Sequence, residues 1–217
     1  KAGTVSIAGR VVSRASEKIA QDAALQATPA HPWVSRAGVK LDYALNQFQI
    51  DVAGANSLDI GASTGGFTQV LLTRGAARVV SIDVGHSQLH DTLANDPRVT
   101  SLEGKDARTL TAGDIGFVPD VIVCDASFIS LAKLLGPVLA LAGAQTQLVT
   151  LFKPQFEVGR AHVGKGGIVT DTAAVARAEA VFVDWLRGQG WQVLARADSP
   201  ISGGDGNEER LVLAARA

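Results

Sequence analysis

Residues 58–68 read LDIGASTGGFT and join a short apolar stretch to a turn that holds three glycines. Gly61, Gly65 and Gly66 allow a tight turn and a close approach of the backbone to a ligand. The next residues carry apolar side chains at helical spacing, and Gly75 ends that run. A strand, a glycine-rich turn and a helix in this order predict the first unit of an α/β domain with a ligand at the turn.

The glycine spacing separates this turn from two common phosphate-binding loops. The second glycine falls four residues after the first, so the dinucleotide pattern G-x-G-x-x-G is not met. The Gly-Lys-Ser/Thr ending of a P-loop is missing as well. A plain strand-to-helix turn without a ligand is the alternative.

The alternation of strands and helices continues to the end of the chain. We predict a helix from Ser35, as its N-cap, to about residue 48, a helix over 128–142, a glycine-rich loop over 154–170, and a long helix that Thr170 or Asp171 caps. Strands are predicted at 57–62, 78–83, 99–107, 120–127, 147–153, 191–197 and 209–215.

The last two predicted strands are joined by about ten residues, SPISGGDGNE. A parallel crossover needs roughly a dozen residues or more, which are usually helical. We therefore expect the final strand to run antiparallel to its predecessor in an otherwise parallel sheet.

Polar side chains stand at the ends of several predicted strands. Asp83, Asp106 and Asp125 follow apolar runs, and Lys153 ends another run just before Pro154. The carboxyl ends of parallel strands form the ligand edge of such sheets, so a site is predicted there. Asp83 suits ribose hydroxyls, a placement that NAD enzymes share, and a buried lysine requires partners because an unpaired ammonium costs several kcal/mol.

The composition is that of a globular protein. Of 217 residues, 47% are hydrophobic and 19% charged, which argues against a disordered chain. The single cysteine, Cys124, excludes an internal disulfide and is expected in the core. No apolar run reaches the roughly 18–20 residues of a membrane span, so a cytoplasmic protein is expected. The chain holds no methionine and opens at Lys1, so we expect a fragment, and its histidines show no metal-site spacing.

The first forty residues differ from the rest in charge. They hold six Lys or Arg residues and two acidic ones, a net +4, so the remainder carries −5 of the total −1. This indicates a basic arm on an acidic body, unless it is chance. Residues 5–12 predict two short strands around Gly9, and the polar residues 13–34, with Pro29 and Pro32, predict a connecting segment that ends at Trp33.

Five motifs follow one another in the chain: SRAGVKL, DIGASTGGFT, CDASFISL, KPQFEVG and GNEE. In this order they resemble the TlyA-type proteins, which are FtsJ-like ribose 2′-O-methyltransferases also labelled hemolysins. The opening residues resemble the second half of an alpha-L RNA-binding motif. The resemblance implies a partial RNA-binding domain over 1–28, a linker over 29–34 and a methyltransferase domain over 35–217. The implied fold is the Rossmann-like class I S-adenosylmethionine (SAM) methyltransferase sheet.

The resemblance also implies site residues. The family's Lys-Asp-Lys-Glu set falls on Lys40, Asp125, Lys153 and Glu209, which we call the tetrad, and Arg210 stands where the family often has an aromatic residue. The residues expected to bind SAM are Asp59, at the methionyl amine, Asp83, at the ribose, Asp106, at the adenine amino group, and Gly61, Ser63, Gly65 and Gly66 of the turn.

Methyl transfer to a ribose hydroxyl requires a base for the hydroxyl proton. Free lysine has a pKa of about 10.4 and is a poor base at neutral pH, but burial or a nearby cation lowers that pKa. We therefore predict Lys153 as the base, positioned by the rest of the tetrad, with a buried structural ion-pair network as the alternative. Phe128 and Phe156 follow site residues, and core packing is expected for each, with stacking on a base as the alternative.

The leading functional hypothesis is a SAM-dependent RNA 2′-O-methyltransferase. The resemblance implies ribosomal RNA, as such or in ribosomal subunits, as the partner and cytidine as the modified base. A membrane-active hemolysin, a catalytically silent RNA- or SAM-binding protein and an NAD(P) oxidoreductase are the alternatives. A membrane partner is not expected, because the chain offers no apolar span.

Overall fold

The computed structural model describes residues 5–12, 14, 16–27 and 30–217. The chain divides into two compact units, residues 1–32 and 33–217. Pro29 of the predicted connecting segment, and the proposed boundary after residue 28, lie outside the described residues.

The first unit holds a small antiparallel sheet. Its strands are β1 (Val5–Ile7), β2 (Arg10–Val11) and β3 (Leu25–Ala27), with β1 in the centre. The hairpin around Gly9 is confirmed. The third strand was missed, since residues 25–27 were assigned to the connecting segment. The reason is that β3 has only three residues, all of them exposed, so its pairing with β1 leaves no local signal.

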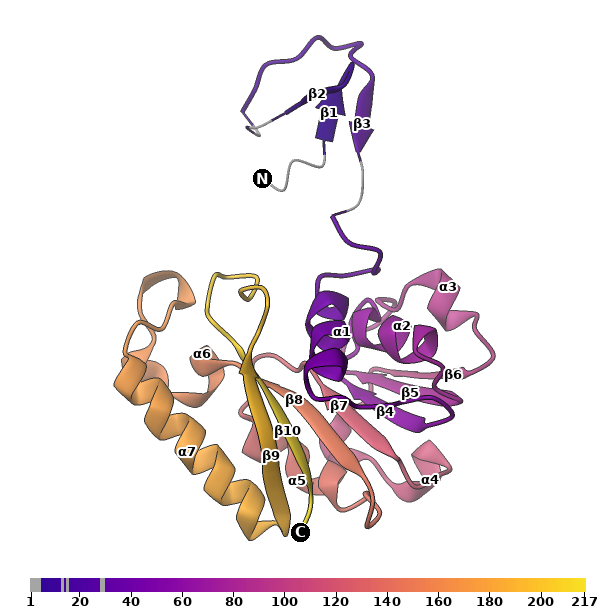
Figure 1. The fold of residues 1–217 in the computed structure, drawn as a ribbon, viewed down its shortest axis with the longest axis vertical. Helices are drawn as coiled ribbons and strands as arrows, with labels where there is room; N and C mark the ends of the chain where they lie inside the picture. The colour runs from indigo at the N-terminus through magenta and orange to yellow at the C-terminus, as the bar shows by residue number, and fades with distance from the viewer. Residues whose placement is uncertain (1–4, 13, 15, 28–29) are drawn as a thin grey trace. The chain divides into compact units, whose positions relative to one another are not determined.

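The second unit is built on a seven-stranded sheet, shown in Figure 1, with the order β6-β5-β4-β7-β8-β10-β9. In this sheet β10 runs in the direction opposite to that of the other six strands. The antiparallel last strand expected from the short connection is therefore confirmed. The strands are β4 (Asn56–Ile60), β5 (Arg78–Asp83), β6 (Val99–Glu103), β7 (Val121–Cys124), β8 (Gln147–Phe152), β9 (Trp191–Asp198) and β10 (Arg210–Arg216).

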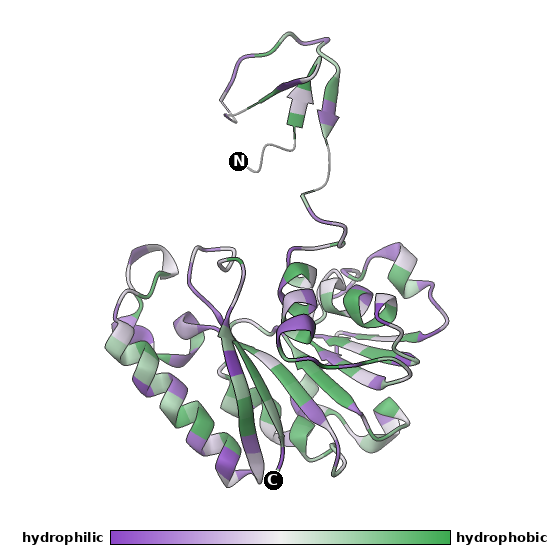
Figure 2. Cartoon of the chain, viewed as in Figure 1, coloured by the Kyte–Doolittle hydropathy of each residue, from purple (hydrophilic) through white to green (hydrophobic). Residues whose placement is uncertain are grey.

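Helices cover both faces of this sheet. On one face α1 (Ala37–Gln47) and α2 (Gly66–Thr73) pack against alternate strand residues such as Val123 and Val149. On the other face α5 (Leu131–Leu139) and α7 (Thr172–Gly188) pack against the intervening ones, such as Ile122. Figure 2 shows the apolar colouring concentrated in the central strands. Short helices α3 (Asp91–Ala94), α4 (Ala112–Ile115) and α6 (Pro154–Glu157) lie in the connections.

Several helix boundaries differ from those predicted. Asp171 caps α7 as expected, since its Oδ1 accepts a hydrogen bond from the Ala174 amide at 2.9 Å. Ser35 does not cap α1, because the N-cap position falls on Arg36. The helix predicted from 128 begins only at Leu131, since Phe128 has a φ of +68° that no right-handed helix accommodates. The loop predicted over 154–170 opens instead with α6, whose first residue is a proline.

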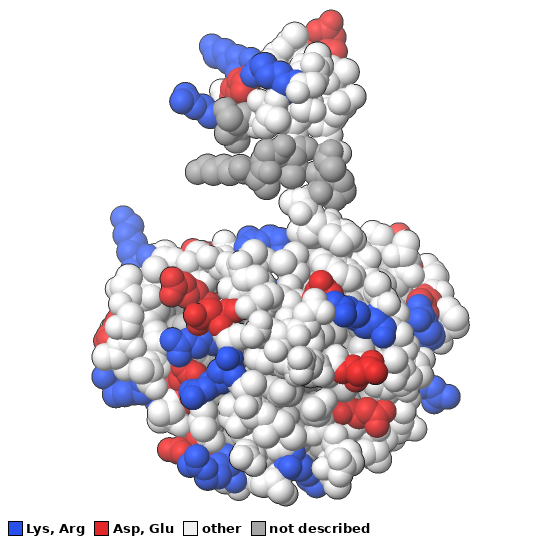
Figure 3. Space-filling model, viewed as in Figure 1, with Lys and Arg blue, Asp and Glu red and all other residues white. Residues whose placement is uncertain are grey.

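Charged side chains are interspersed over the surface. Figure 3 shows acidic and basic groups close together on the visible face of the larger unit. None of the helices in the described part of the chain has the length and apolarity that a membrane crossing requires.

Candidate active site

Two neighbouring parallel strands bring Asp125 and Lys153 together. Asp125 directly follows β7, Lys153 directly follows β8, and the two strands pair in parallel from Val121 to Cys124. The Lys153 Nζ lies 2.6 Å from Asp125 Oδ1, and only 7% of the residue is exposed. Strand pairing thus supplies the partner that a lysine at this buried strand end requires.

The Lys153 ammonium has two aligned acceptors besides this ion pair. It donates hydrogen bonds to the Asp125 carbonyl oxygen at 3.1 Å and to the Ser127 Oγ at 3.0 Å. The 2.6 Å contact with Asp125 Oδ1 is an ion pair but not an aligned hydrogen bond, and this oxygen accepts none within the described residues. The ammonium is therefore held by one charged and two neutral oxygens.

The other half of the tetrad is a second buried ion pair. Lys40, on the buried face of α1, donates to Glu209 Oε2, which directly precedes β10. Lys40 is 6% exposed and Glu209 4%. Because Lys40 lines the same hollow as Asp125 and Lys153, two lysine–carboxylate pairs stand at one edge of the sheet.

Two hollows meet at this edge. The smaller, of about 470 Å³, is lined by Lys40, Asp125 and Lys153. The larger, of about 720 Å³, is lined by Asp83 and Asp106 together with apolar side chains. Both hollows share four residues: Gly61, Ser63, Asp125 and Ser127. A molecule in the larger hollow can therefore reach the paired lysine that lines the smaller one.

The carboxylates of the larger hollow are anchored by nearby donors. Asp83 accepts from the Ser63 amide at 2.8 Å and from the Gly85 amide at 2.7 Å. Asp106 accepts from the amide and the guanidinium of Arg108, which holds its pKa below the usual range. Asp106 lies three residues beyond the end of β6, which is shorter than predicted. Each carboxylate has lone pairs left for a ligand.

The glycines of the turn have different roles. Gly61 has a φ of +79°, and a Cβ there would lie 2.9 Å from the Ala126 Cα, so only glycine allows this approach to β7. A Cβ on Gly66 would lie 2.2 Å from the Ser35 Oγ, and one on Gly65 2.4 Å from a Leu93 methyl group.

Gly65 and Gly66 are absent from the described walls of both hollows. Glycine is needed at these two positions for helix packing, and their predicted contact with a cofactor stays a prediction. Gly61 and Ser63 do line the hollows, and Ser63 adopts a positive φ of 48° there.

Asp59 is the predicted site residue that lies deepest in the core. It is completely buried, and its Oδ2 accepts from the Thr68 hydroxyl of α2 at 2.6 Å. Burial raises the pKa of Asp59 to about 7. Its side chain is absent from the described walls of both hollows, and its contact with the methionyl amine of a cofactor stays a prediction.

Phe128 is the largest departure among the aromatic residues. Core packing was predicted, but the side chain is 91% exposed. Its ring centroid lies 5.3 Å from that of Phe156 in a tilted arrangement. Phe128 also lines the larger hollow, so an exposed ring stands at the entrance of the site. Cys124 is buried as expected, and its pKa is raised to about 11 by burial.

Asn207 was not singled out from the sequence. It is 2% exposed, its Oδ1 accepts from the Val169 amide at 2.9 Å, and its Nδ2 donates to the Gly167 carbonyl at 2.8 Å. These bonds join the glycine-rich segment to the loop that leads into Glu209. The only sequence signal for a role of Asn207 was its place in the GNEE motif. Asparagine is common in exposed turns, so the sequence does not show that this one is buried.

Arg210 faces away from the tetrad. Its guanidinium pairs with Glu179 of α7, a residue that is 3% exposed and also accepts from Arg196 at 3.1 Å. Successive side chains of a strand point to opposite faces, so Glu209 and Arg210 serve opposite sides of the sheet. The departure from the family's aromatic residue therefore concerns packing on α7. Glu179 could have been suspected from its place on the apolar face of that helix.

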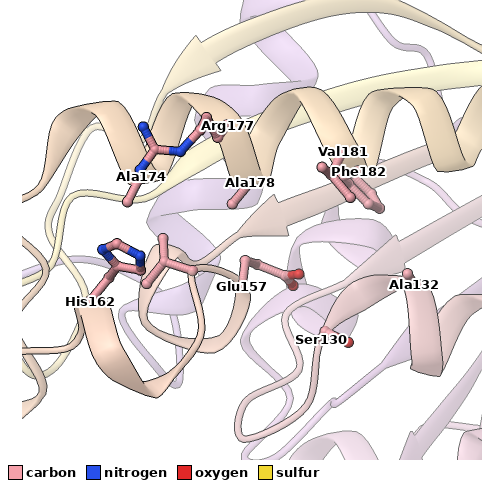
Figure 4. A pocket seen from close by; sticks show the side chains of 10 residues that line it. Ser130, Ala132, Glu157, His162, Ala174, Arg177, Ala178, Val181 and Phe182 are labelled. Atoms are coloured by element: carbon pink, nitrogen blue, oxygen red, sulfur yellow. The ribbon is translucent and has the colours of Figure 1, made fainter.

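A third hollow lies between α7 and the segment around α6, as Figure 4 shows. It measures about 330 Å³ and includes Glu157, His162 and Arg177, while the tetrad is absent from its described walls. Glu157 Oε1 accepts from the Leu131 amide at 2.8 Å. Burial raises the pKa of Glu157 from 4.5 to about 7.

This raised pKa predicts a pH-dependent stability. The unfolded chain ionises Glu157 near pH 4.5, while the folded chain resists ionisation up to about pH 7. The folded state therefore loses stability as the pH rises through this window, by about 3 kcal/mol when complete. Glu157→Gln keeps the acceptor for Leu131. It is expected to raise the free energy of unfolding at pH 8 and leave it unchanged at pH 4.

Urea denaturation at both pH values measures this difference, and Glu208→Gln, at an exposed position, serves as the control. Equal stability of the Glu157→Gln variant and the wild type at pH 8 would contradict the assignment.

Comparisons with known proteins agree with this geometry. The sequence matches the FtsJ-like methyltransferase family over residues 33–216. The 16S/23S rRNA (cytidine-2′-O)-methyltransferase TlyA of Mycobacterium tuberculosis is 45% identical over 96% of this chain and 78% of its own length. A solved structure of a hemolysin candidate from Streptococcus thermophilus has a TM-score of 0.83 and 37% identity, covering all of this chain and 80% of that one.

A more distant structure shows the fold alone. The S-adenosylmethionine-dependent methyltransferase from Mesorhizobium loti is 16% identical, with a TM-score of 0.58 over 80% of this chain and 96% of its own. The fold is thus that of the Rossmann-like methyltransferases. Within this class, the chain belongs to the FtsJ-like methyltransferase family.

Proposed function

We propose that the protein transfers a methyl group from SAM to the 2′-hydroxyl of a ribose in ribosomal RNA, at a cytidine. The observation that carries the proposal is the buried Lys153–Asp125 pair at the junction of two hollows. One hollow offers room for a cofactor and the other for an acceptor. The activity named for the M. tuberculosis relative supports the choice of RNA and base.

The larger hollow fits SAM. Its apolar wall, with Ile82, Ala107 and Leu134, suits the faces of an adenine ring, and Asp83 offers carboxylate oxygens for ribose hydroxyls. Gly61 lines this hollow and, having no side chain, presents its backbone to the ligand. The carboxylate of Asp106, placed for the adenine amino group, shares its oxygens with Arg108.

The tetrad supplies the acid–base chemistry. When bound, SAM would supply a sulfonium methyl group to the attacking oxygen. Lys153, as a neutral amine, would take the proton of the 2′-hydroxyl as that oxygen attacks. Asp125 stabilises the resulting ammonium, and the Lys40–Glu209 pair holds the wall of the acceptor hollow.

The alternatives receive less support. A catalytically silent binding protein does not require a tetrad that is complete, buried and paired, as it is here. The hemolysin name of the structural relative describes that protein and adds no site on this chain. For an NAD(P) oxidoreductase the turn has the wrong glycine spacing. We also propose that the protein acts on ribosomal subunits in the cytoplasm, in keeping with its ribosomal RNA-modifying relatives.

Transfer of a labelled methyl group from SAM to isolated ribosomal subunits tests the proposal. We expect label in an alkali-resistant dinucleotide, because a 2′-O-methyl group blocks cleavage of the adjoining phosphodiester. Subunits first treated with the protein and unlabelled SAM are the control and should accept no further label. Alkali-labile label would indicate methylation of a base, and SAM binding without transfer would favour a binding role.

A further inference from the structure

We propose that Ser127 is a positioning residue that directs the lone pair of Lys153 toward the acceptor hydroxyl. The inference rests on the proposed function, in which Lys153 is the base. It goes beyond the tetrad, because Ser127 belongs to none of the four positions and acts through one of them.

The contacts of Lys153 single out Ser127. Nζ donates to the Ser127 Oγ at 3.0 Å and to the Asp125 carbonyl oxygen at 3.1 Å. Both acceptors are neutral, and Ser127 is among the four residues that line both hollows. The serine is thus the only side-chain hydroxyl that the described residues offer to Nζ, and it stands where cofactor and acceptor meet.

The geometry of an amine explains what this contact achieves. A neutral lysine amine has two hydrogens and one lone pair in tetrahedral directions. When the two hydrogens go to the Ser127 Oγ and the Asp125 carbonyl, the lone pair is confined to the remaining direction. The 2.6 Å ion-pair contact with Asp125 Oδ1 is not aligned as a hydrogen bond, so the two neutral acceptors are the ones that orient the hydrogens of the amine.

Proton transfer to Lys153 accompanies methyl transfer to the hydroxyl oxygen. The lone pair of Lys153 accepts the 2′-hydroxyl proton, the oxygen forms its bond to the methyl carbon, and sulfur keeps the electron pair of the broken bond. The new ammonium has its charge partner in place, since Asp125 Oδ1 lies 2.6 Å from Nζ. Without Ser127 one hydrogen of the neutral amine loses its aligned acceptor, so only the bond to the Asp125 carbonyl orients the amine and the lone pair is less well directed.

Removal of the hydroxyl should therefore lower turnover more than binding. For Ser127→Ala we expect kcat to fall about 10- to 100-fold, as for other misplacements of a reacting group, with the Kd for SAM changed less than about threefold. A second effect is expected on the pH profile. A hydrogen bond from a charged donor is stronger than one from a neutral donor, so loss of the acceptor should move the midpoint of the kcat profile to lower pH.

The experiment compares Ser127→Ala, Ser127→Thr and Ser127→Cys with the wild type, and Ser130→Ala is the matched control in the same segment. Threonine keeps the hydroxyl and should restore kcat, while cysteine, a weak acceptor of similar volume, should fall between serine and alanine. Ser130 lines the third hollow and contacts none of the tetrad among the described residues, so its variant should behave as wild type.

A measurement without cofactor or RNA keeps the test independent of turnover. Labelling of Lys153 by acetic anhydride, followed by mass spectrometry across pH, reports the fraction of neutral amine directly. The labelling midpoint should fall in Ser127→Ala and stay with the wild type in Ser127→Thr. If Ser127→Ala fails to fold, Ser127→Cys carries the same comparison.

Wild-type kcat and an unchanged labelling midpoint in Ser127→Ala would overturn the inference. This outcome is distinct from a failure of the proposed function, because in that case the wild-type protein itself would transfer no methyl group. In that case the labelling midpoints still decide whether Ser127 governs Lys153.

Discussion

Lys153→Ala is expected to lose methyl transfer by about 10³-fold or more while still binding SAM. A positioned general base contributes about 10²- to 10⁴-fold, and this variant also leaves the Asp125 carboxylate without its ion-pair partner. SAM affinity should change little, because Lys153 lines the acceptor hollow and is absent from the described walls of the larger one. Single-turnover transfer to ribosomal subunits and calorimetric titration with SAM measure the two quantities.

Two further variants make this result interpretable. Lys133→Ala removes an exposed lysine of α5 and should leave turnover unchanged. Lys153→Arg retains a cation beside Asp125 but cannot act as a base near neutral pH, because arginine stays protonated. It should be as inactive as the alanine variant and closer to the wild type in stability. Full activity in either Lys153 variant would place the base elsewhere.

Much of the fold could be predicted because the signals are local. The central strands are rich in apolar residues, and β7 and β8 are each followed by a polar residue, which is why Asp125 and Lys153 were found. The antiparallel last strand followed from a connection too short for a crossover. Because β7 and β8 are parallel neighbours, their carboxyl ends lie side by side. The sequence could therefore predict that Asp125 and Lys153 come together.

Other features of the site depend on the direction in which a side chain points, and the sequence does not show this direction. Asp59 lies inside β4 between two residues of one core and faces α2 on the opposite side, where its carboxylate accepts a hydrogen bond from Thr68. Phe128 is exposed because its backbone turns left-handed just before α5. Ser127 resembles any serine after a strand, and only the fold brings it to Lys153.

The second large effect concerns the buried Lys40–Glu209 pair. Removal of one partner leaves the other charge buried and unpaired, which costs about 3–5 kcal/mol. Both residues are less than a tenth exposed, so we expect Lys40→Met and Glu209→Leu each to lower the free energy of unfolding by about that amount. Each should also lose methyl transfer. Denaturant unfolding and single-turnover assays of the two variants test these expectations.

The double variant Lys40→Met/Glu209→Leu separates stability from catalysis. Replacing a whole buried ion pair by apolar side chains is often neutral or stabilising, so the double variant should recover most of the stability that each single change removes. If the pair forms part of the acceptor site, methyl transfer should stay lost in this stable protein, because Lys40 no longer presents a cation to the hollow beside Lys153. If the pair were only structural, activity would return with stability, and the catalytic set would shrink to Lys153 and Asp125.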